Sequence, residues 1–204
     1  MNNAGIMAVP PAETKEGYEI QFGTNHMGHA LLTRLLMPIL QSTAKQPDAD
    51  VRVINLTSEG HNFARTPSVL CNQEELKRSG VWVKYGYSKL ANILFARALA
   101  LNHPDLTSVS IHPGVINTDL YLPNQQSNPI MRLGLAVGGW LRTSVSTGAF
   151  NQLWAATCRK ERIESGAYYT PVGAKSQGSP CACNKDLAKQ LWDWTEKELD
   201  AKGY

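Results

Sequence analysis

The sequence predicts an α/β fold built on a mostly parallel sheet, in which short strands alternate with longer amphipathic helices. Runs rich in β-branched residues, such as residues 51–57, are separated by segments whose apolar residues recur at helical spacing. Turn-forming residues end the runs, as where the strand over 109–113 stops at a Pro-Gly pair. Alternation of this kind is typical of strands joined by crossover helices. We expect one domain over residues 1–204, because neither a linker nor a repeat interrupts the pattern.

The elements are assigned from local periodicity and from their end signals. A proline loop after residue 5 leads into a long helix, a polar excursion fills residues 59–80, and residues 119–143 read as a loop and a weak helix. Helices are expected over residues 18–40, 73–78, 85–101, 147–158 and 187–199, and strands over 51–57, 109–113 and 166–170, with a strand stub at 2–5.

The number of strands indicates that the sheet is incomplete. Three complete strands are fewer than a doubly wound sheet usually has, and no G-x-G-x-x-G turn follows any of them. We therefore expect a Rossmann-like doubly wound sheet that lacks its N-terminal βαβ units, roughly 60–90 residues at about 30 per unit. The strand over 51–57 would then expose an apolar edge.

Composition and charge exclude several functions. The chain is 43% hydrophobic and 18% charged, which indicates a globular protein, and its net charge of +3 is scattered. Without a basic stripe interleaved with aromatics, nucleic-acid binding is not expected. The first residues do not match a secretory signal and no apolar run is long enough to span a bilayer, so we expect a cytoplasmic protein.

No metal site or disulfide is expected. His26 and His29 lie three apart on the long predicted helix, but no third ligand is near them in the sequence, so we read them as helix-face histidines. The four cysteines have neither zinc nor disulfide-framework spacing, which favours free thiols. They are Cys71, Cys158, Cys181 and Cys183.

The strongest chemical signal is the segment Tyr85-Gly-Tyr-Ser-Lys89. Tyr85 and Lys89 are four apart, so on a helix they share one face, one turn from each other. An ammonium near a phenol favours the phenolate and lowers its pKa from about 10 toward the working range. A tyrosine tuned in this way exchanges a proton with a substrate oxygen. By itself the pair also fits a solvated helix face, so its context decides.

Two neighbouring features supply that context. The strand over 51–57 ends at Ser58, and the strand over 109–113 ends at Pro113-Gly114. Because open α/β sheets bind ligands at the carboxyl ends of their strands, we expect Ser58, the Tyr85/Lys89 helix and the Pro-Gly loop to meet in one crevice. Alone, Ser58 would read as an ordinary capping serine.

The combined motifs resemble the short-chain dehydrogenase/reductase family. Within that family the Ser-Lys-Leu-Ala-Asn run after Tyr85, the Ile-His-Pro-Gly strand end and the long gap from Ser58 to Tyr85 are most similar to the retinol-dehydrogenase-like branch and related fungal reductases. The motifs in chain order are Asn2-Asn-Ala-Gly5, Asn25 within Thr24-Asn-His-Met-Gly28, Asn55-Leu-Thr-Ser58, Tyr85-x-x-x-Lys89, and Pro113-Gly114 followed by Thr118.

The resemblance implies a catalytic set of four residues. Tyr85 would be the acid/base, and Lys89 would hold the nicotinamide ribose and lower the pKa of Tyr85. Ser58 would hydrogen-bond and orient the substrate carbonyl. Asn25 would hold a water that connects Lys89 to solvent.

It also implies a nicotinamide cofactor, NADP or NAD, with NADP favoured by the resemblance. The residue that would distinguish the two is not among the 204 residues. The reaction would interconvert a carbonyl and an alcohol on a small apolar substrate, with hydride from the cofactor. Besides Tyr85 and Lys89, the cofactor-binding residues would be Asn3, Ala4 and Gly5 on the adenosine side and Pro113, Gly114, Ile116 and Thr118 at the nicotinamide end.

Alternatives remain open for substrate binding and for the role of the chain. Residues 121–143 resemble the variable substrate loop of the family, although a surface helix explains them equally well. The helices over 18–40 and 85–101 resemble the family's dimerisation pair, which implies a homo-oligomer, a homodimer in the simplest case. Because the glycine-rich turn TGxxxGxG is absent, the alternative function is that of a catalytically silent, N-terminally truncated fragment that serves only as an interaction module.

Overall fold

The core of the molecule is a four-stranded sheet, seen in a computed structural model that describes residues 1–114 and 145–204. Its order is β1-β2-β3-β4, with β1, β2 and β3 mutually parallel and β4 antiparallel to β3. The α/β class with a mostly parallel sheet is confirmed. β4 was not predicted, because its Ala-Lys-Ser sequence has none of the β-branched or aromatic residues that indicate a strand. The strands are β1 (Arg52–Leu56), β2 (Thr107–Ile111), β3 (Tyr168–Thr170) and β4 (Ala174–Ser176).

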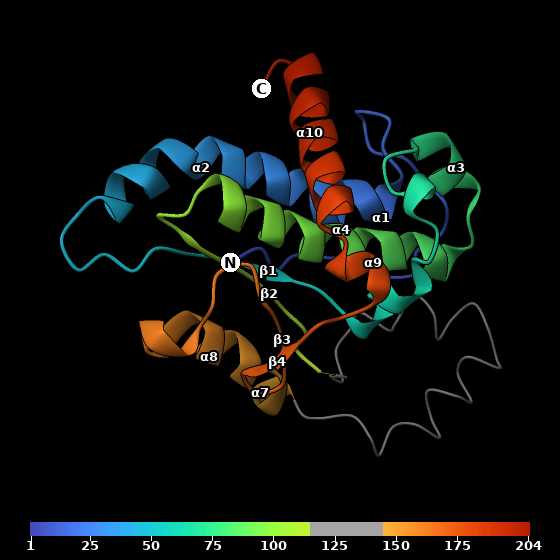
Figure 1. The fold of residues 1–204 in the computed structure, drawn as a ribbon. Helices are drawn as coiled ribbons and strands as arrows, with labels where there is room; N and C mark the ends of the chain where they lie inside the picture. Colours follow the sequence, from blue (N-terminus) through green and yellow to red (C-terminus); the bar gives the residue numbers. More distant parts are fainter. Residues whose placement is uncertain (115–144) are drawn as a thin grey trace.

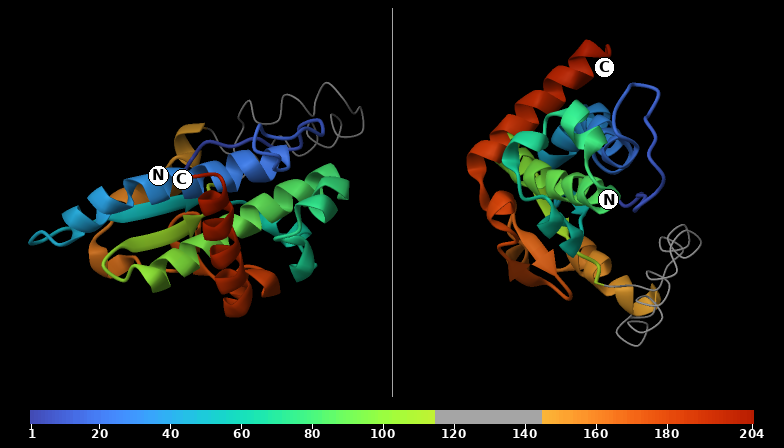
Figure 2. Two further views of the ribbon diagram at one scale, coloured as in Figure 1. Left: turned by 90° about the horizontal axis from the view of Figure 1, so that it is seen from above. Right: turned by 90° about the vertical axis from the view of Figure 1, so that its right-hand side faces the viewer.

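Helices cover both faces of this sheet (Figure 1). The helices α1, α2, α4 and α10 lie over one face, and α7 and α8 lie against the other (Figures 1 and 2). The α-helices are α1 (Ile20–Phe22), α2 (Gly28–Ala44), α3 (Gln73–Arg78), α4 (Val81–Asn102), α7 (Val145–Gly148), α8 (Phe150–Thr157), α9 (Pro180–Cys183) and α10 (Lys185–Ala201). The shorter helical turns are η1 (Gly23–Met27), η2 (Glu59–Phe63), η3 (Pro67–Val69) and η6 (Lys160–Arg162).

The outer edge of β1 is partly covered by the start of the chain. The Asn2 amide donates to the Ile54 carbonyl (2.8 Å), and the Leu56 amide donates to the Asn2 carbonyl (3.0 Å). The predicted strand stub is thus a single parallel bridge between Asn2 and Asn55. The prediction that the edge of β1 is open is therefore wrong at its C-terminal end, where backbone groups are hydrogen-bonded to Asn2.

The long helix predicted over residues 18–40 consists of three consecutive pieces that continue to Ala44. Between α1 and α2 the backbone widens into the π-helical turn η1. Gly23 opens this turn, and a Cβ there would lie 2.3 Å from Thr14 Cγ2, so only glycine fits without movement. The sequence analysis predicted one continuous helix here and did not identify this turn.

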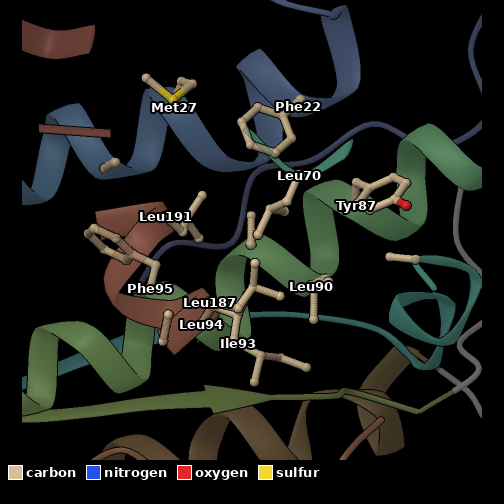
Figure 3. Close-up of a cluster of buried hydrophobic side chains, with 14 of the residues drawn as sticks. Phe22, Met27, Leu70, Tyr87, Leu90, Ile93, Leu94, Phe95, Leu187 and Leu191 are labelled. Atoms are coloured by element: carbon tan, nitrogen blue, oxygen red, sulfur yellow. The ribbon is translucent and has the colours of Figure 1, made fainter. Parts of the chain in front are cut away.

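The main hydrophobic cluster lies between the sheet and the helices above it (Figure 3). Helix α4 is its centre, with Leu90, Ile93 and Leu94 without exposed surface, and α10 contributes Leu187 and Leu191. Helix α4 starts four residues before the predicted position and is buried along most of its length, which explains its weak amphipathic character. A second cluster on the other face joins β1 and β2 to α8.

We expect Leu94→Ala to reduce the free energy of unfolding by about 2–5 kcal/mol. Leu94 is fully buried, so truncation removes apolar burial and leaves a cavity. Leu101→Ala on the same helix is the control, because Leu101 is 74% exposed and should cost less than about 0.5 kcal/mol. Urea unfolding followed by circular dichroism measures both values. Equal losses in the two variants would contradict this packing of α4.

Candidate active site

Tyr85 and Lys89 lie on α4 one turn apart, as the sequence predicted. Tyr85 is 4% exposed and Lys89 is 6% exposed. The Lys89 Nζ atom lies 5.7 Å from the centroid of the Tyr85 ring and donates to the Leu56 carbonyl (3.3 Å). Burial lowers the pKa of Lys89 to about 8, because the charged ammonium is taken out of water. A lysine cation is thus held beside a buried phenol.

Gly60 lies between Ser58 and the Tyr85 ring and contacts both. Ser58 caps the turn η2, and its Oγ accepts a hydrogen bond from the Gly60 amide (3.1 Å). A Cβ on Gly60 would lie 2.8 Å from Tyr85 Cε1 and 3.5 Å from Ser58 Oγ. The predicted proximity of Ser58 to the Tyr85/Lys89 helix is therefore found. The sequence analysis did not single out Gly60, although it follows the strand end directly.

We expect Gly60→Ala to destabilise the protein by about 1–3 kcal/mol, because the added methyl group would overlap the Tyr85 ring. Gly80→Ala is the matched control, since no atom lies within 4 Å of the position of its Cβ. Thermal unfolding of both variants checks this. If Gly60→Ala were no less stable than Gly80→Ala, the close approach of η2 to Tyr85 would be wrong.

Asn25 is buried in the π-helical turn with both ends of its amide engaged. Its Oδ1 accepts from the Ile6 amide (2.8 Å), and its Nδ2 donates to the Ile6 carbonyl (2.9 Å) and to Ser88 Oγ (2.9 Å). Ser88 in turn donates to the Tyr85 carbonyl (2.8 Å). Asn25 therefore joins the N-terminal segment to the helix that carries Tyr85 and Lys89.

Gly5 brings the N-terminal segment against this group. A Cβ at Gly5 would lie 3.1 Å from Asn25 Oδ1 and 3.5 Å from Lys89 Nζ. Asn3, Ala4 and Gly5 are themselves exposed. An exposed segment whose last residue approaches the Lys89 ammonium is suited to contact a bound ligand.

Two side chains that the sequence analysis did not assign lock α4 to the end of β1. Thr57 Oγ1 donates to the Lys89 carbonyl (2.7 Å), and Asn92 Nδ2 donates to the Leu56 carbonyl (2.8 Å). Both hydrogen bonds are buried. Because buried hydrogen bonds are costly to leave unmade, they fix Lys89 relative to the carboxyl edge of the sheet. In the sequence, only the presence of Asn92 in the Leu-Ala-Asn run pointed to this contact between α4 and β1.

The loop after β2 is described only in part. Pro113 and Gly114 follow the carboxyl end of β2, and Gly114 has φ +92°, a conformation that favours glycine. Since β1 and β2 are parallel, Pro113 and Gly114 lie at the same edge of the sheet as Ser58. Ile116, Thr118 and the predicted substrate loop over 121–143 lie outside the described residues.

His26 and His29 face different neighbours. The His26 Nε2 atom lies 3.1 Å from Thr195 Oγ1, whereas the His29 Nδ1 atom lies 3.0 Å from the Asn25 carbonyl. Within residues 1–114 and 145–204 no group of three or more His, Cys, Asp or Glu side chains is placed to hold a metal ion. The cysteines, all in the described part of the chain, are free. No helix there is long and apolar enough to cross a membrane.

The structure thus brings the buried Tyr85/Lys89 pair close to Ser58 and Asn25 beside a mostly parallel sheet, as the family motifs imply. No protein-family model matches the chain. Over 98% of its length, however, the chain is 35% identical to the short-chain dehydrogenase/reductase drtF of Aspergillus calidoustus and covers 67% of that protein. It is 33% identical to human retinol dehydrogenase 12, covering 58% of it. The chain belongs to the short-chain dehydrogenase/reductase family.

Solved structures agree with this assignment. A protein from Mycobacterium paratuberculosis matches 97% of the chain with a TM-score of 0.66 and 29% identity, and 65% of that protein is covered. The carbonyl reductase Sniffer of D. melanogaster shares the fold at a TM-score of 0.52 and 20% identity. The chain spans 53% to 67% of the first five curated relatives. Its family is one of NAD(P)-dependent oxidoreductases, and the match to fungal and retinol-dehydrogenase relatives confirms the predicted branch.

Proposed function

We propose that the protein interconverts a carbonyl and an alcohol on a small apolar substrate with NADPH or NADH. The observation that carries this proposal is the approach of Ser58, Gly60, Tyr85 and Lys89 to one another at the carboxyl edge of the sheet. The supporting family assignment is independent of this geometry. The fold alone would not decide the activity, because one fold hosts many chemistries.

In this proposal each of the four side chains has one role. Tyr85 Oη transfers the proton to or from the substrate oxygen, and the Lys89 ammonium favours the tyrosinate through its charge. Ser58 Oγ donates to the same substrate oxygen and orients it. Asn25 fixes the N-terminal segment and connects to the Tyr85 carbonyl through Ser88. A bound nicotinamide supplies or accepts the hydride.

The described residues fit the nicotinamide-ribose end of such a cofactor. An ammonium has three donors, and Lys89 Nζ has one hydrogen bond at 3.3 Å to Leu56, which leaves capacity for ribose hydroxyls. A Cβ at Gly5 would crowd Asn25 Oδ1 at 3.1 Å and would contact Lys89 Nζ at 3.5 Å, so glycine leaves room beside the ammonium. Asn3, Ala4, Pro113 and Gly114 would border the cofactor, and Ile116 and Thr118 remain proposals from the family motif. The 204 residues contain no TGxxxGxG turn for the pyrophosphate.

An apolar substrate is favoured by the surroundings of Tyr85. Met7 and Ala8 pack with the Tyr85 ring, and Trp82 borders this cluster one turn before Tyr85 on α4. The Phe63 ring lies edge-on to Trp82 with centroids 6.5 Å apart and is 50% exposed. Aromatic and aliphatic surface of this kind binds apolar groups and leaves recognition of the reacting oxygen to polar atoms.

The test of cofactor binding is a titration of the 204-residue chain with NADPH and NADH. We expect saturable enhancement of nucleotide fluorescence in protein that circular dichroism shows to be folded, and turnover with apolar aldehydes or ketones. NADPH is expected to bind more tightly than NADH. A folded chain that binds neither nucleotide would contradict the proposed activity for these residues and leave the second function.

The second candidate is an interaction module without catalysis, which an exposed apolar face of α2 favours. Leu32, Leu35, Leu36 and Ile39 form an exposed apolar stripe on α2 at helical spacing. Exposed apolar stripes mark association surfaces, so we propose a homo-oligomer that uses α2. Light scattering that shows only monomer would count against it. A protein that forms dimers but does not bind nucleotide would support the interaction module over the oxidoreductase.

A further inference from the structure

His61 is a buried histidine that connects Ser58 to the C-terminal part of the chain. It lies in the turn η2 and is 1% exposed. Its Nδ1 atom is 2.7 Å from the Ser58 carbonyl oxygen, and its Nε2 atom is 3.1 Å from the Ser179 backbone nitrogen. The ring therefore bridges two segments that are 118 residues apart in the sequence.

These two partners determine which ring nitrogen carries the proton. A carbonyl oxygen only accepts hydrogen bonds, so Nδ1 must carry a hydrogen toward Ser58. A backbone N–H only donates, so Nε2 must be bare toward Ser179. Both bonds form only in the neutral imidazole with its proton on Nδ1. The Ser58 carbonyl also accepts from the His61 amide (3.0 Å), so His61 holds it twice.

The surroundings leave the ring little freedom to move. Tyr168 packs edge-on against it with centroids 5.5 Å apart, and the Tyr168 hydroxyl donates to Glu59 Oε1 (2.9 Å) on the same turn. A Cβ at Gly178 would lie 3.2 Å from His61 Nε2, and Gly178 has φ +76°, so a side chain there would be strained. The strand β3 and the segment before α9 thus close over the turn.

We propose that His61 is a positioning residue, which, as the neutral Nδ1-H tautomer, ties Ser58 and Gly60 to the start of α9 and so sets their place against Tyr85. The kinetic consequence rests on the proposed oxidoreductase function, whereas the structural consequence does not. A change in the ring contacts would shift Ser58 through its carbonyl and Gly60 through its bond to Ser58 Oγ. Displacements of about 1 Å in such groups lower rates by up to roughly 100-fold.

The tautomer is tested by nitrogen NMR of the imidazole rings in the complete 204-residue chain at neutral pH. We expect the His61 ring to show a protonated Nδ1 and an unprotonated Nε2. The opposite tautomer, or a ring protonated on both nitrogens, would overturn the bridge. This measurement needs neither cofactor nor turnover.

Two substitutions separate the two ends of the bridge. The amide nitrogen of His61→Asn takes the place of Nδ1 and keeps a donor to Ser58, whereas the longer amide of His61→Gln takes the place of Nε2 and keeps an acceptor for Ser179. We expect His61→Gln to increase hydrogen exchange at the Gly60 amide by about tenfold or more, and His61→Asn to have a smaller effect. Asn62→Ala is the matched control, because it removes two exposed hydrogen bonds to Glu59 in the same turn and leaves the His61 bridge intact, so it should change exchange at Gly60 less than His61→Gln does.

The kinetic arm distinguishes failure of this inference from failure of the proposed function. In protein that reduces carbonyls, His61→Gln should lower kcat by about 10- to 100-fold with little change in the KM for NADPH. If wild-type protein shows no turnover but His61→Gln still increases exchange at the Gly60 amide, the proposed function is refuted and the positioning role of His61 stands. Unchanged exchange and unchanged kcat in His61→Gln would refute the positioning role alone.

Discussion

Replacing Tyr85 by phenylalanine is expected to lower carbonyl reduction by about 10²- to 10⁴-fold while cofactor affinity changes little. The substitution removes one oxygen from a ring that packs against Gly60, Met7 and Ala8, so the ring keeps its packing and loses the hydroxyl that we propose transfers the proton. Oxidation of NADPH in the presence of apolar aldehydes measures the rate, and nucleotide fluorescence measures the affinity.

The matched control for that experiment is Tyr87→Phe on the same helix. The Tyr87 hydroxyl donates to the Thr66 carbonyl (2.9 Å) and accepts from the Thr66 amide (3.2 Å), so it serves packing of the loop. Loss of this hydroxyl should reduce the free energy of unfolding by about 1 kcal/mol and leave the rate of carbonyl reduction within a few-fold of the wild-type rate. Retained turnover in Tyr85→Phe, or an equal loss in both variants, would remove Tyr85 from its proposed role.

The second large effect is an acid-induced loss of stability that depends on His26. Burial lowers the pKa of His26 to about 3, with a smaller contribution from nearby His29. Its ring packs between Phe22 and Phe95, with centroids 5.1 and 5.6 Å away. An imidazolium in this place would be charged among aromatic rings, so the folded protein keeps the ring neutral.

The direction follows from proton binding in the two states. The unfolded chain protonates His26 below its ordinary pKa of 6.5, whereas the folded chain does not until about pH 3. Stability from this group is therefore complete above pH 6.5 and falls as the pH decreases toward 3. The slope approaches about 1.4 kcal/mol per pH unit. Burial also lowers the pKa of His29 and His112, which adds to the loss.

Urea unfolding of wild type and His26→Asn at several pH values isolates this contribution. The measurements belong between about pH 6 and pH 5, above the range in which most carboxylates titrate. We expect the variant to be less stable at neutral pH but to lose stability less steeply on acidification. Glu19 and His112 titrate in both proteins, so their effects cancel in the difference, which then contains His26 and its coupling to His29. Parallel curves would show that His26 is not buried in its neutral form.

Much of the site was predictable because its signals are local. The four-residue spacing of Tyr85 and Lys89 places them together on any helix, and a strand end determines where Ser58 projects. A short helix was predicted near residues 73–78, and α3 has those bounds, with acidic side chains in its first turn and basic ones in its last. The helix over residues 81–102 was predicted over 85–101, so four residues at its start and one at its end were missed, and its burial on several faces weakens the amphipathic pattern.

The sequence by itself determined the α/β class, the order of the elements, the family motifs and the helical pairing of Tyr85 with Lys89. Only the tertiary structure decided that Gly60 touches the Tyr85 ring, that Asn2 covers part of the β1 edge, and that His61 joins Ser58 to Ser179. The physical reason is the range of the interactions. Periodicity and turn chemistry act over a few residues, whereas steric fit and buried hydrogen bonds arise between segments that meet only after the chain has folded.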